Sequence, residues 1–242
     1  MKIDVNCDMG EGLDEVDAAI MPFITSANIA CGAHAGGAEI MTKTIRLAKK
    51  HGVAVGAHPG WPDKEGFGRR EMSLTADEVE TLVFDQINAL AGIAKIENIT
   101  LHHVKPHGAL YNQAVKDRVL ADAIARAVSR FSRELVLVGL AGSGSVETGA
   151  QIGLRVAHEA FPDRHYNPDG TLRSRSEADA LLESPEEIAA HAVHLARDGI
   201  QFEGRNIKPD TLCLHGDHVH AVENAKLVRA KLEENGIRVV SL

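Results

Sequence analysis

The sequence predicts a distorted (β/α) barrel of seven to eight parallel strands. Short aliphatic or β-branched runs recur along all 242 residues, and amphipathic helical patterns separate most of them. Because each helix must carry the chain back across the sheet, successive strands are expected to pair in parallel. The expected strands cover residues 2–7, 26–31, 53–57, 100–104, 135–139, 154–158, 211–215 and 237–241.

The expected helices carry their own start and stop signals. Thr75 and Glu78 form a capping box at the start of one helix, and another begins after Ser184 and stops before Gly199. Apolar side chains recur on one face of each pattern, as expected for helices that pack on a sheet. The expected helices cover residues 38–51, 76–97, 117–131, 185–198 and 221–235, with a further one opening near residue 144.

This alternation is compatible with a closed barrel or with a doubly wound open sheet. The first strand is not followed by Gly-x-Gly-x-x-Gly, and the units average about 30 residues, which favours the barrel. Long connections over residues 58–75 and 159–184 predict that the barrel is distorted. No linker, repeat or low-complexity segment divides the chain, so we expect a single barrel domain over residues 1–242.

The charge balance excludes two classes of partner. With 26 Lys and Arg against 34 Asp and Glu, the net charge is −8, which disfavours binding to nucleic acid or to a membrane surface. The uncharged stretch over residues 18–38 contains polar and glycine residues unsuited to a spanning helix. Cys7, Cys31 and Cys213 lie in apolar runs without C-x-x-C spacing, which predicts reduced, structural thiols in a cytoplasmic protein.

Titratable side chains follow the ends of several predicted strands. Because the carboxyl ends of parallel strands meet on one side of a barrel, these side chains are expected to share one pocket. Each histidine taken alone is also explained as a hydrogen-bonded core residue, and the coincidence at several strand ends favours a site. On the first strand the period of two directs Asp4, Asn6 and Asp8 into the barrel. The five residues expected to converge are Asp8, His34, His58, Lys105 and His107.

Two further features have alternative explanations. The segment from Gly139 to Ser145 follows a strand and opens a helix, so it either binds an anion through backbone amides or forms a tight turn. It lacks the Gly-Lys-Ser/Thr ending of a Walker A loop. Arginines in the two long loops are either solvated surface charges or ligands for a carboxylate or phosphate. They are Arg69, Arg70, Arg164, Arg173 and Arg175.

Six sequence blocks, in order, resemble the LamB/YcsF family. They are Asn6-Cys-Asp-Met-Gly-Glu-Gly12, Ser26-Ala-Asn-Ile-Ala-Cys-Gly-Ala-His-Ala-Gly36, Gly56-Ala-His-Pro-Gly60, Gly66-Phe-Gly-Arg-Arg70, His103-Val-Lys-Pro-His-Gly-Ala-Leu-Tyr-Asn112 and His215-Gly-Asp217. The resemblance runs over nearly the whole chain. It implies a barrel similar to the glycoside hydrolase and polysaccharide deacetylase group. The chain departs from the family pattern at His218-Val-His220 and in a shorter connection over residues 199–210.

The family is the A subunit of bacterial ATP-dependent 5-oxoprolinase. The resemblance therefore implies hydrolytic opening of the lactam 5-oxo-L-proline to L-glutamate, with ATP as co-substrate and subunits B and C as partners. For this chemistry we assign Asp8 as the general base, Lys105 as the cation that stabilises the lactam oxygen or its phosphate, and His107 as the acid. Substrate contacts are assigned to Asn6, Asn28, His34, His58, Arg69, Tyr111, Glu159 and His215.

Two other hypotheses stay open. One is a metal-dependent deacetylase-like barrel hydrolase, because an aspartate with two histidines, here Asp8, His34 and His58, is a common set of divalent-metal ligands. The other is a noncatalytic subunit that only binds the lactam. The need for a divalent metal and the formation of a homo-oligomer are left undecided. Because a Walker A loop is lacking, the isolated chain is expected neither to bind ATP tightly nor to show oxoprolinase activity.

Overall fold

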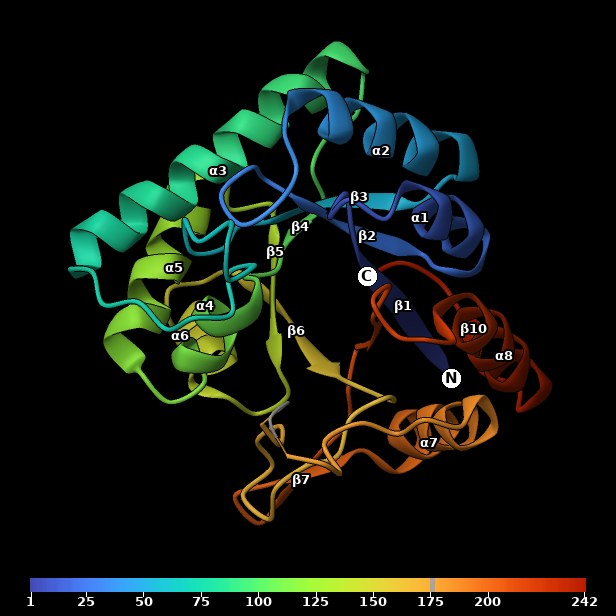
Figure 1. Cartoon of the computed structure of the whole chain (residues 1–242). Coiled ribbons are helices and arrows are strands. Elements are labelled where there is room, and N and C mark those ends of the chain that lie inside the picture. Colours follow the sequence, from blue (N-terminus) through green and yellow to red (C-terminus); the bar gives the residue numbers. More distant parts are fainter. Residues whose placement is uncertain (175–176) are drawn as a thin grey trace.

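Seven parallel strands close into a barrel in the computed structural model, which describes residues 1–174 and 177–242 (Figure 1). The last of these strands pairs back with the first, which confirms the predicted barrel and excludes an open sheet. Arg175 of the predicted arginine set lies outside the described residues. In hydrogen-bonded order the strands are β1 (Lys2–Met9), β2 (Ser26–Ala30), β3 (Ala54–His58), β4 (His103–Val104), β5 (Val136–Leu140), β6 (Arg155–Ala160) and β9 (Thr211–Leu214).

The eighth predicted strand is present but lies outside this ring. β10 (Arg238–Val239) pairs in parallel with the first residues of β1, where Lys2 is opposite Arg238. From Asp4 onward β1 pairs with β9 instead. β1 therefore changes its partner along its length, and the extra strand extends the sheet at the amino end of the barrel.

Helices surround the barrel in Figure 1. The two helices predicted over residues 38–51 and 185–198 have those bounds, and the capping box of Thr75 and Glu78 is formed at the start of α3. Because the helices lie outside the strands, the interior is left to the strand side chains. The helices are α1 (Asp14–Ile20), α2 (Ala38–His51), α3 (Ala76–Ile96), α4 (Gly108–Ala114), α5 (Arg118–Phe131), α6 (Gly144–Gln151), α7 (Pro185–Asp198) and α8 (Ala221–Glu234), with a short 3-10 helix, η1 (Met21–Phe23).

An antiparallel hairpin interrupts the barrel pattern near the carboxyl terminus. It joins β7 (Ile200–Phe202) to β8 (Arg205–Ile207), and sequence patterning does not predict it. Glu203 and Gly204 form its turn, both with positive φ, which is the geometry of a two-residue hairpin loop. Glutamate is an unusual residue in that position, so the turn has no recognisable sequence signal.

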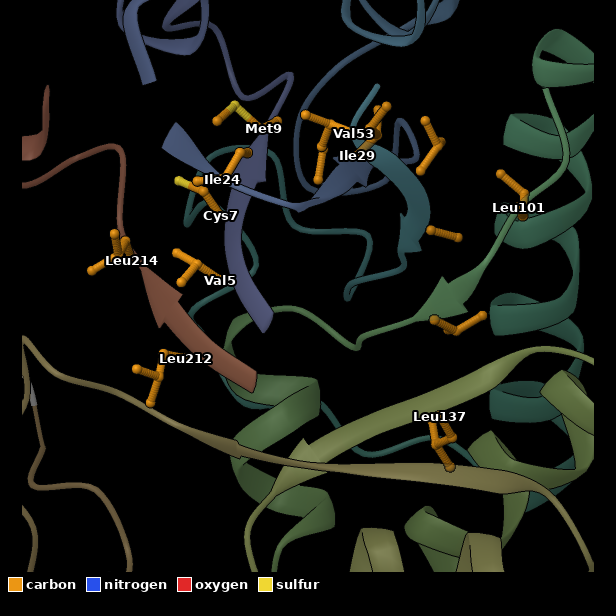
Figure 2. Packing of buried hydrophobic residues seen from close by; sticks show 14 of the residues in the cluster. Val5, Cys7, Met9, Ile24, Ile29, Val53, Leu101, Leu137, Leu212 and Leu214 are labelled. Carbon is orange, nitrogen blue, oxygen red and sulfur yellow. The ribbon is translucent and has the colours of Figure 1, made fainter. Parts of the chain in front are cut away.

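Alternation along β1 separates the apolar core from the barrel interior. Val5, Cys7 and Met9 are buried in the core cluster that the helices share, and Figure 2 shows them along β1, with Leu212 and Leu214 on the neighbouring β9. Burying these side chains stabilises the fold by about 1.5–3 kcal/mol for each large one. The intervening side chains must therefore point into the barrel, where polar groups need partners. Among the described residues, no helix is both long and apolar enough to cross a bilayer.

Candidate active site

Asn6, in the middle of β1, connects the polar side chains inside the barrel. Its Nδ2 donates to Glu159 Oε1 at 2.9 Å and to Thr211 Oγ1 at 2.6 Å. Its Oδ1 accepts from Asn28 Nδ2 at 2.7 Å, and Asn28 also donates to Asp8 Oδ1 at 2.8 Å. The amides of both asparagines are thus held by protein groups, so these residues fix Asp8 and Glu159 in place.

Lys105, directly after β4, is the buried cation of this network. Its side chain is 3% exposed, and Nζ lies 3.0 Å from Asp8 Oδ1 and 2.9 Å from Glu159 Oε1. The ammonium also donates to Cys213 Sγ at 2.9 Å. Burial alone would lower the pKa of Lys105, but Asp8, Cys213 and Glu159 outweigh it and hold the pKa well above its usual range. Lys105 therefore carries a fixed positive charge at neutral pH.

Asp8, at the end of β1, lies between this cation and a group of histidines. Its Oδ2 is 3.3 Å from His58 Nε2, and its side chain is 12% exposed. Burial raises the pKa of Asp8, but His58 and Lys105 together lower it by more. The pKa of Asp8 therefore lies well below its usual range. The carboxylate is therefore ionised at neutral pH and partly accessible, as a group that accepts a proton from bound water must be.

Glu11 and three histidines meet beside Asp8. Glu11 Oε1 lies 2.9 Å from His34 Nε2, 3.3 Å from His107 Nδ1 and 3.9 Å from His58 Nε2. Burial, with a contribution from the charge of Asp8, raises the pKa of Glu11 to about 7. Burial also lowers the pKa of His34 to about 3 and that of His107 to about 2. Neutral imidazoles beside a carboxylate can hold a divalent metal ion.

A pocket of about 570 Å³ opens over these groups at the carboxyl ends of the strands. His215, in its wall, has Nδ1 2.6 Å from Asp163 Oδ2, a contact that fixes the orientation of the imidazole. Arg69, at the rim, pairs with Asp217 at 2.6 Å. Tyr111 also lines the pocket, and burial, reinforced by Glu159, keeps its pKa well above the usual range. The pocket thus offers charged groups, a phenol and an oriented imidazole to a small polar ligand.

The sequence-predicted site residues lie in three parts of the barrel mouth: inside the barrel, in the histidine group beside Asp8, and along the lining of the pocket. Asp8 and Lys105 are within hydrogen-bond distance, as the hypothesis of a shared site requires. Asn6, Asn28 and Glu159 lie inside the barrel, where their contacts are to other buried groups. His34 is in the histidine group and does not line the pocket. Those that line the pocket are Asp8, His58, Arg69, Lys105, His107, Tyr111 and His215.

Three placements differ from the sequence-based expectations. His107, assigned as the acid, donates from Nε2 to the Phe67 carbonyl oxygen at 2.9 Å and directs Nδ1 to His58 at 2.9 Å rather than to the pocket, and its low pKa leaves it neutral. Cys213, expected to be structural, points inward to Lys105. Glu11, in the Gly-Glu-Gly segment after β1, has no role in the sequence-based assignment, although it joins the metal-capable group in place of Asp8.

The glycine-rich segment after β5 forms a turn in which three successive amides already have protein partners. Gly144 N–H donates to the Val115 carbonyl, Ser143 N–H to the Leu140 carbonyl and Gly142 N–H to His158 Nδ1. A backbone anion site needs several N–H groups that face a ligand. The tight-turn interpretation of this segment is therefore the better one.

The closed parallel barrel and the mouth at its strand ends define a (β/α)-barrel protein with a pocket of charged and polar side chains at the carboxyl ends of its strands. The peptidoglycan deacetylase PdaC from Bacillus subtilis has the same general fold, with a TM-score of 0.53 and 14% identity over 100% of this chain and 87% of that one. This likeness concerns the fold alone. The chain belongs to the LamB/YcsF family, whose model matches residues 3–242.

Relatives within the family match the chain from end to end. The 5-oxoprolinase A subunit from Tolumonas auensis is 49% identical over 249 residues, covering 100% of this chain and 99% of that protein. A protein of the same name from Bacillus licheniformis is 48% identical, covering 98% and 97%. The crystal structure of a lactam utilization protein from Thermus thermophilus superimposes with a TM-score of 0.90 at 45% identity, covering 100% of both chains.

Proposed function

We propose that this chain is the A subunit of an ATP-dependent 5-oxoprolinase and opens 5-oxo-L-proline to L-glutamate at its barrel mouth. The observation that carries the proposal is the pair of Asp8 and Lys105, a proton acceptor and a fixed cation 3.0 Å apart at the edge of the pocket. Relatives that bear the name of the 5-oxoprolinase A subunit, at 48% and 49% identity, support the choice of substrate.

The chemistry explains why ATP and partner subunits belong to the proposal. A five-membered lactam is a poor electrophile, and phosphorylation of its carbonyl oxygen by ATP would activate the ring carbon. One water adds to that carbon, the ring nitrogen departs with a proton, and a second water releases phosphate from the resulting acyl phosphate. ATP is therefore assigned as co-substrate of the assembled enzyme, and subunits B and C as the proteins that handle the nucleotide. The barrel then contributes a base for water, a cation for the lactam oxygen and a donor for the departing nitrogen.

Lys105 and Asp8 take the first two of these roles. The Lys105 ammonium is held by buried partners and cannot swing into solvent, so it is preorganised to stabilise negative charge on the lactam oxygen or its phosphate. Asp8 is ionised and accepts the proton of the attacking water. As negative charge develops on the lactam oxygen, the fixed ammonium is shared between that oxygen and Asp8, so its hold on Asp8 weakens and the basicity of Asp8 rises.

His215 replaces His107 as the proton donor in this scheme. Its Nδ1 is directed to Asp163 at 2.6 Å, an arrangement that presents the other side of the imidazole to a ligand. It lines the pocket, and its side chain is 13% exposed. His215, Asp8 and Cys213 have polar atoms within 4.8 Å of one another, so a proton passed to the leaving nitrogen would start next to the base. Arg69 at the rim offers a guanidinium to the substrate carboxylate.

The proposal is tested by reconstitution with the partner subunits. The chain is purified alone and together with subunits B and C from the same organism, and glutamate formed from 5-oxo-L-proline is measured with and without ATP. The expected result is glutamate formation that requires both ATP and all three subunits. Appreciable ATP-dependent glutamate production by the chain alone would contradict the assignment of nucleotide handling to subunits B and C. Absence of glutamate from the full assembly would contradict the assigned substrate.

A further inference from the structure

His58 and His107 direct one ring nitrogen each toward the same point. His58 Nδ1 is 2.7 Å from the Lys105 carbonyl oxygen, and His107 Nε2 is 2.9 Å from the Phe67 carbonyl oxygen. A carbonyl oxygen only accepts, so each of these nitrogens carries the hydrogen of its ring. The remaining nitrogens, His58 Nε2 and His107 Nδ1, lie 2.9 Å apart. A cation shared at this point, either a metal ion or the second proton of a charged His58, accounts for the short distance.

The surroundings supply the rest of a ligand set. Glu11 Oε1 lies 3.3 Å from His107 Nδ1 and 2.9 Å from His34 Nε2. The three imidazoles are buried, and Glu11 is partly exposed on the pocket side, which gives an ion a route in. The ligand atoms of all four residues lie within 4.8 Å of one another.

We propose that Glu11, His34, His58 and His107 bind one divalent transition-metal ion at the side of the pocket. The distances fit this assignment. Four ligands at about 2.0–2.1 Å from a tetrahedral zinc ion lie roughly 3.3 Å from one another. The three contacts of Glu11 and the contact between His58 and His107 run from 2.9 to 3.9 Å, and all four ligand atoms lie within 4.8 Å of one another. Three imidazoles and one carboxylate suit zinc, cobalt or manganese rather than magnesium or calcium, which prefer oxygen ligands.

Hydrogen bonds outside the ligand set support the site. The carbonyls of Lys105 and Phe67 fix the tautomers of His58 and His107 and aim their free nitrogens inward, as the outer partners of metal-binding histidines do. Asp8 adds a second carboxylate 3.3 Å from His58 Nε2. A divalent ion bound here would supply Lewis-acid stabilisation of a substrate oxygen.

The alternative explanation is a proton in place of the metal ion. A doubly protonated His58 would donate to either Asp8 or His107 and account for the same short distance. Because metal binding is measured without substrate, ATP or partner subunits, the test succeeds or fails independently of the oxoprolinase proposal.

The experiment is a titration of the chelator-treated full chain with Zn²⁺, and with Co²⁺ as a spectroscopic probe. Isothermal titration calorimetry gives stoichiometry and affinity, and the cobalt spectrum reports on coordination. The wild type is compared with Glu11→Gln and His107→Gln. The control is His194→Gln, which removes an exposed histidine paired with Asp198 on α7. Circular dichroism checks folding, and Glu11→Gln, with its partly exposed side chain, keeps the test valid if His107→Gln does not fold.

The site predicts one equivalent of metal in the wild type and in His194→Gln, with a cobalt spectrum typical of four-coordinate nitrogen and oxygen ligation. Loss of a ligand in Glu11→Gln or His107→Gln is expected to weaken binding by about 100-fold or more. Absence of stoichiometric binding would overturn the proposal. So would wild-type affinity in both Glu11→Gln and His107→Gln. So would ¹⁵N NMR spectra that show a doubly protonated His58 in the presence of one equivalent of zinc.

Discussion

Replacement of Lys105 by methionine is expected to lower the free energy of unfolding, because it leaves buried carboxylates without their cation. Methionine is an unbranched side chain one atom shorter than lysine and carries no charge, so Glu159, which is fully buried, loses the ammonium 2.9 Å away. Breaking a buried ion pair by removing one partner costs about 3–5 kcal/mol. Asn6 still donates to Glu159, and Asn28 to Asp8, which places the expected loss at the lower end of that range.

Urea unfolding followed by circular dichroism measures this loss, and a second substitution tests its cause. Lys105→Met is expected to lower the free energy of unfolding by about 3 kcal/mol, and adding Glu159→Gln should recover about 1–3 kcal/mol because the uncompensated charge is gone. Lys116→Met is the matched control, since Lys116 pairs with Asp169 in solvent at 3.0 Å and should cost less than about 1 kcal/mol. A loss below about 1 kcal/mol for Lys105→Met, or a double variant less stable than the single one, would refute the reasoning.

Two further predictions concern α1 and β3. The Asp17 carboxylate accepts from Gly10 N–H at 2.8 Å, and burial raises its pKa from 3.8 to about 6; its stabilising effect is therefore present below about pH 4 and lost as the pH rises to about 6. Asp17→Asn keeps an acceptor, so its stability relative to wild type should rise by about 2–2.5 kcal/mol from pH 4 to 7; a constant difference would contradict this. A Cβ on Gly56 would lie 2.1 Å from His103 Nε2, so Gly56→Ala should cost at least about 1–3 kcal/mol in urea unfolding. Gly92→Ala on α3, where the added Cβ meets nothing within 4 Å, should instead stabilise by about 0.5–1 kcal/mol; equal effects would refute the packing argument.

The alternation of side chains along the strands and the parallel strand order made much of the fold and of the barrel mouth predictable from the sequence. The period of two on β1 places Asp8 inward, and parallel strands bring Asp8 and Lys105 to the same end of the barrel. The same period on β9 sets Cys213 on the face opposite Leu212 and Leu214, so its inward position had a signal that its apolar surroundings obscured.

Other features depend on geometry that the sequence does not state. Glu11 lies beyond the end of β1, in a loop where the strand period no longer applies, so its approach to His34 depends on the loop path. The engagement of both nitrogens of His107 depends on the Phe67 carbonyl, which comes from a long connection without regular structure. The partner of β10 was equally hidden, because a short apolar run pairs with whichever strand edge is open.

The most direct test of the central claim is the turnover of the Asp8→Asn variant in the assembly with subunits B and C. Asparagine nearly matches aspartate in size and retains an oxygen for Asn28 and Lys105, but it does not accept a proton from water. Asp85→Asn, on an exposed face of α3, is the matched control and should leave turnover unchanged. If Asp8 is the base, Asp8→Asn folds normally and 5-oxo-L-proline turnover falls by a factor of about 100 or more. A loss of less than about threefold, well below the usual effect of losing a general base, would contradict that role and favour a noncatalytic lactam-binding role for the chain.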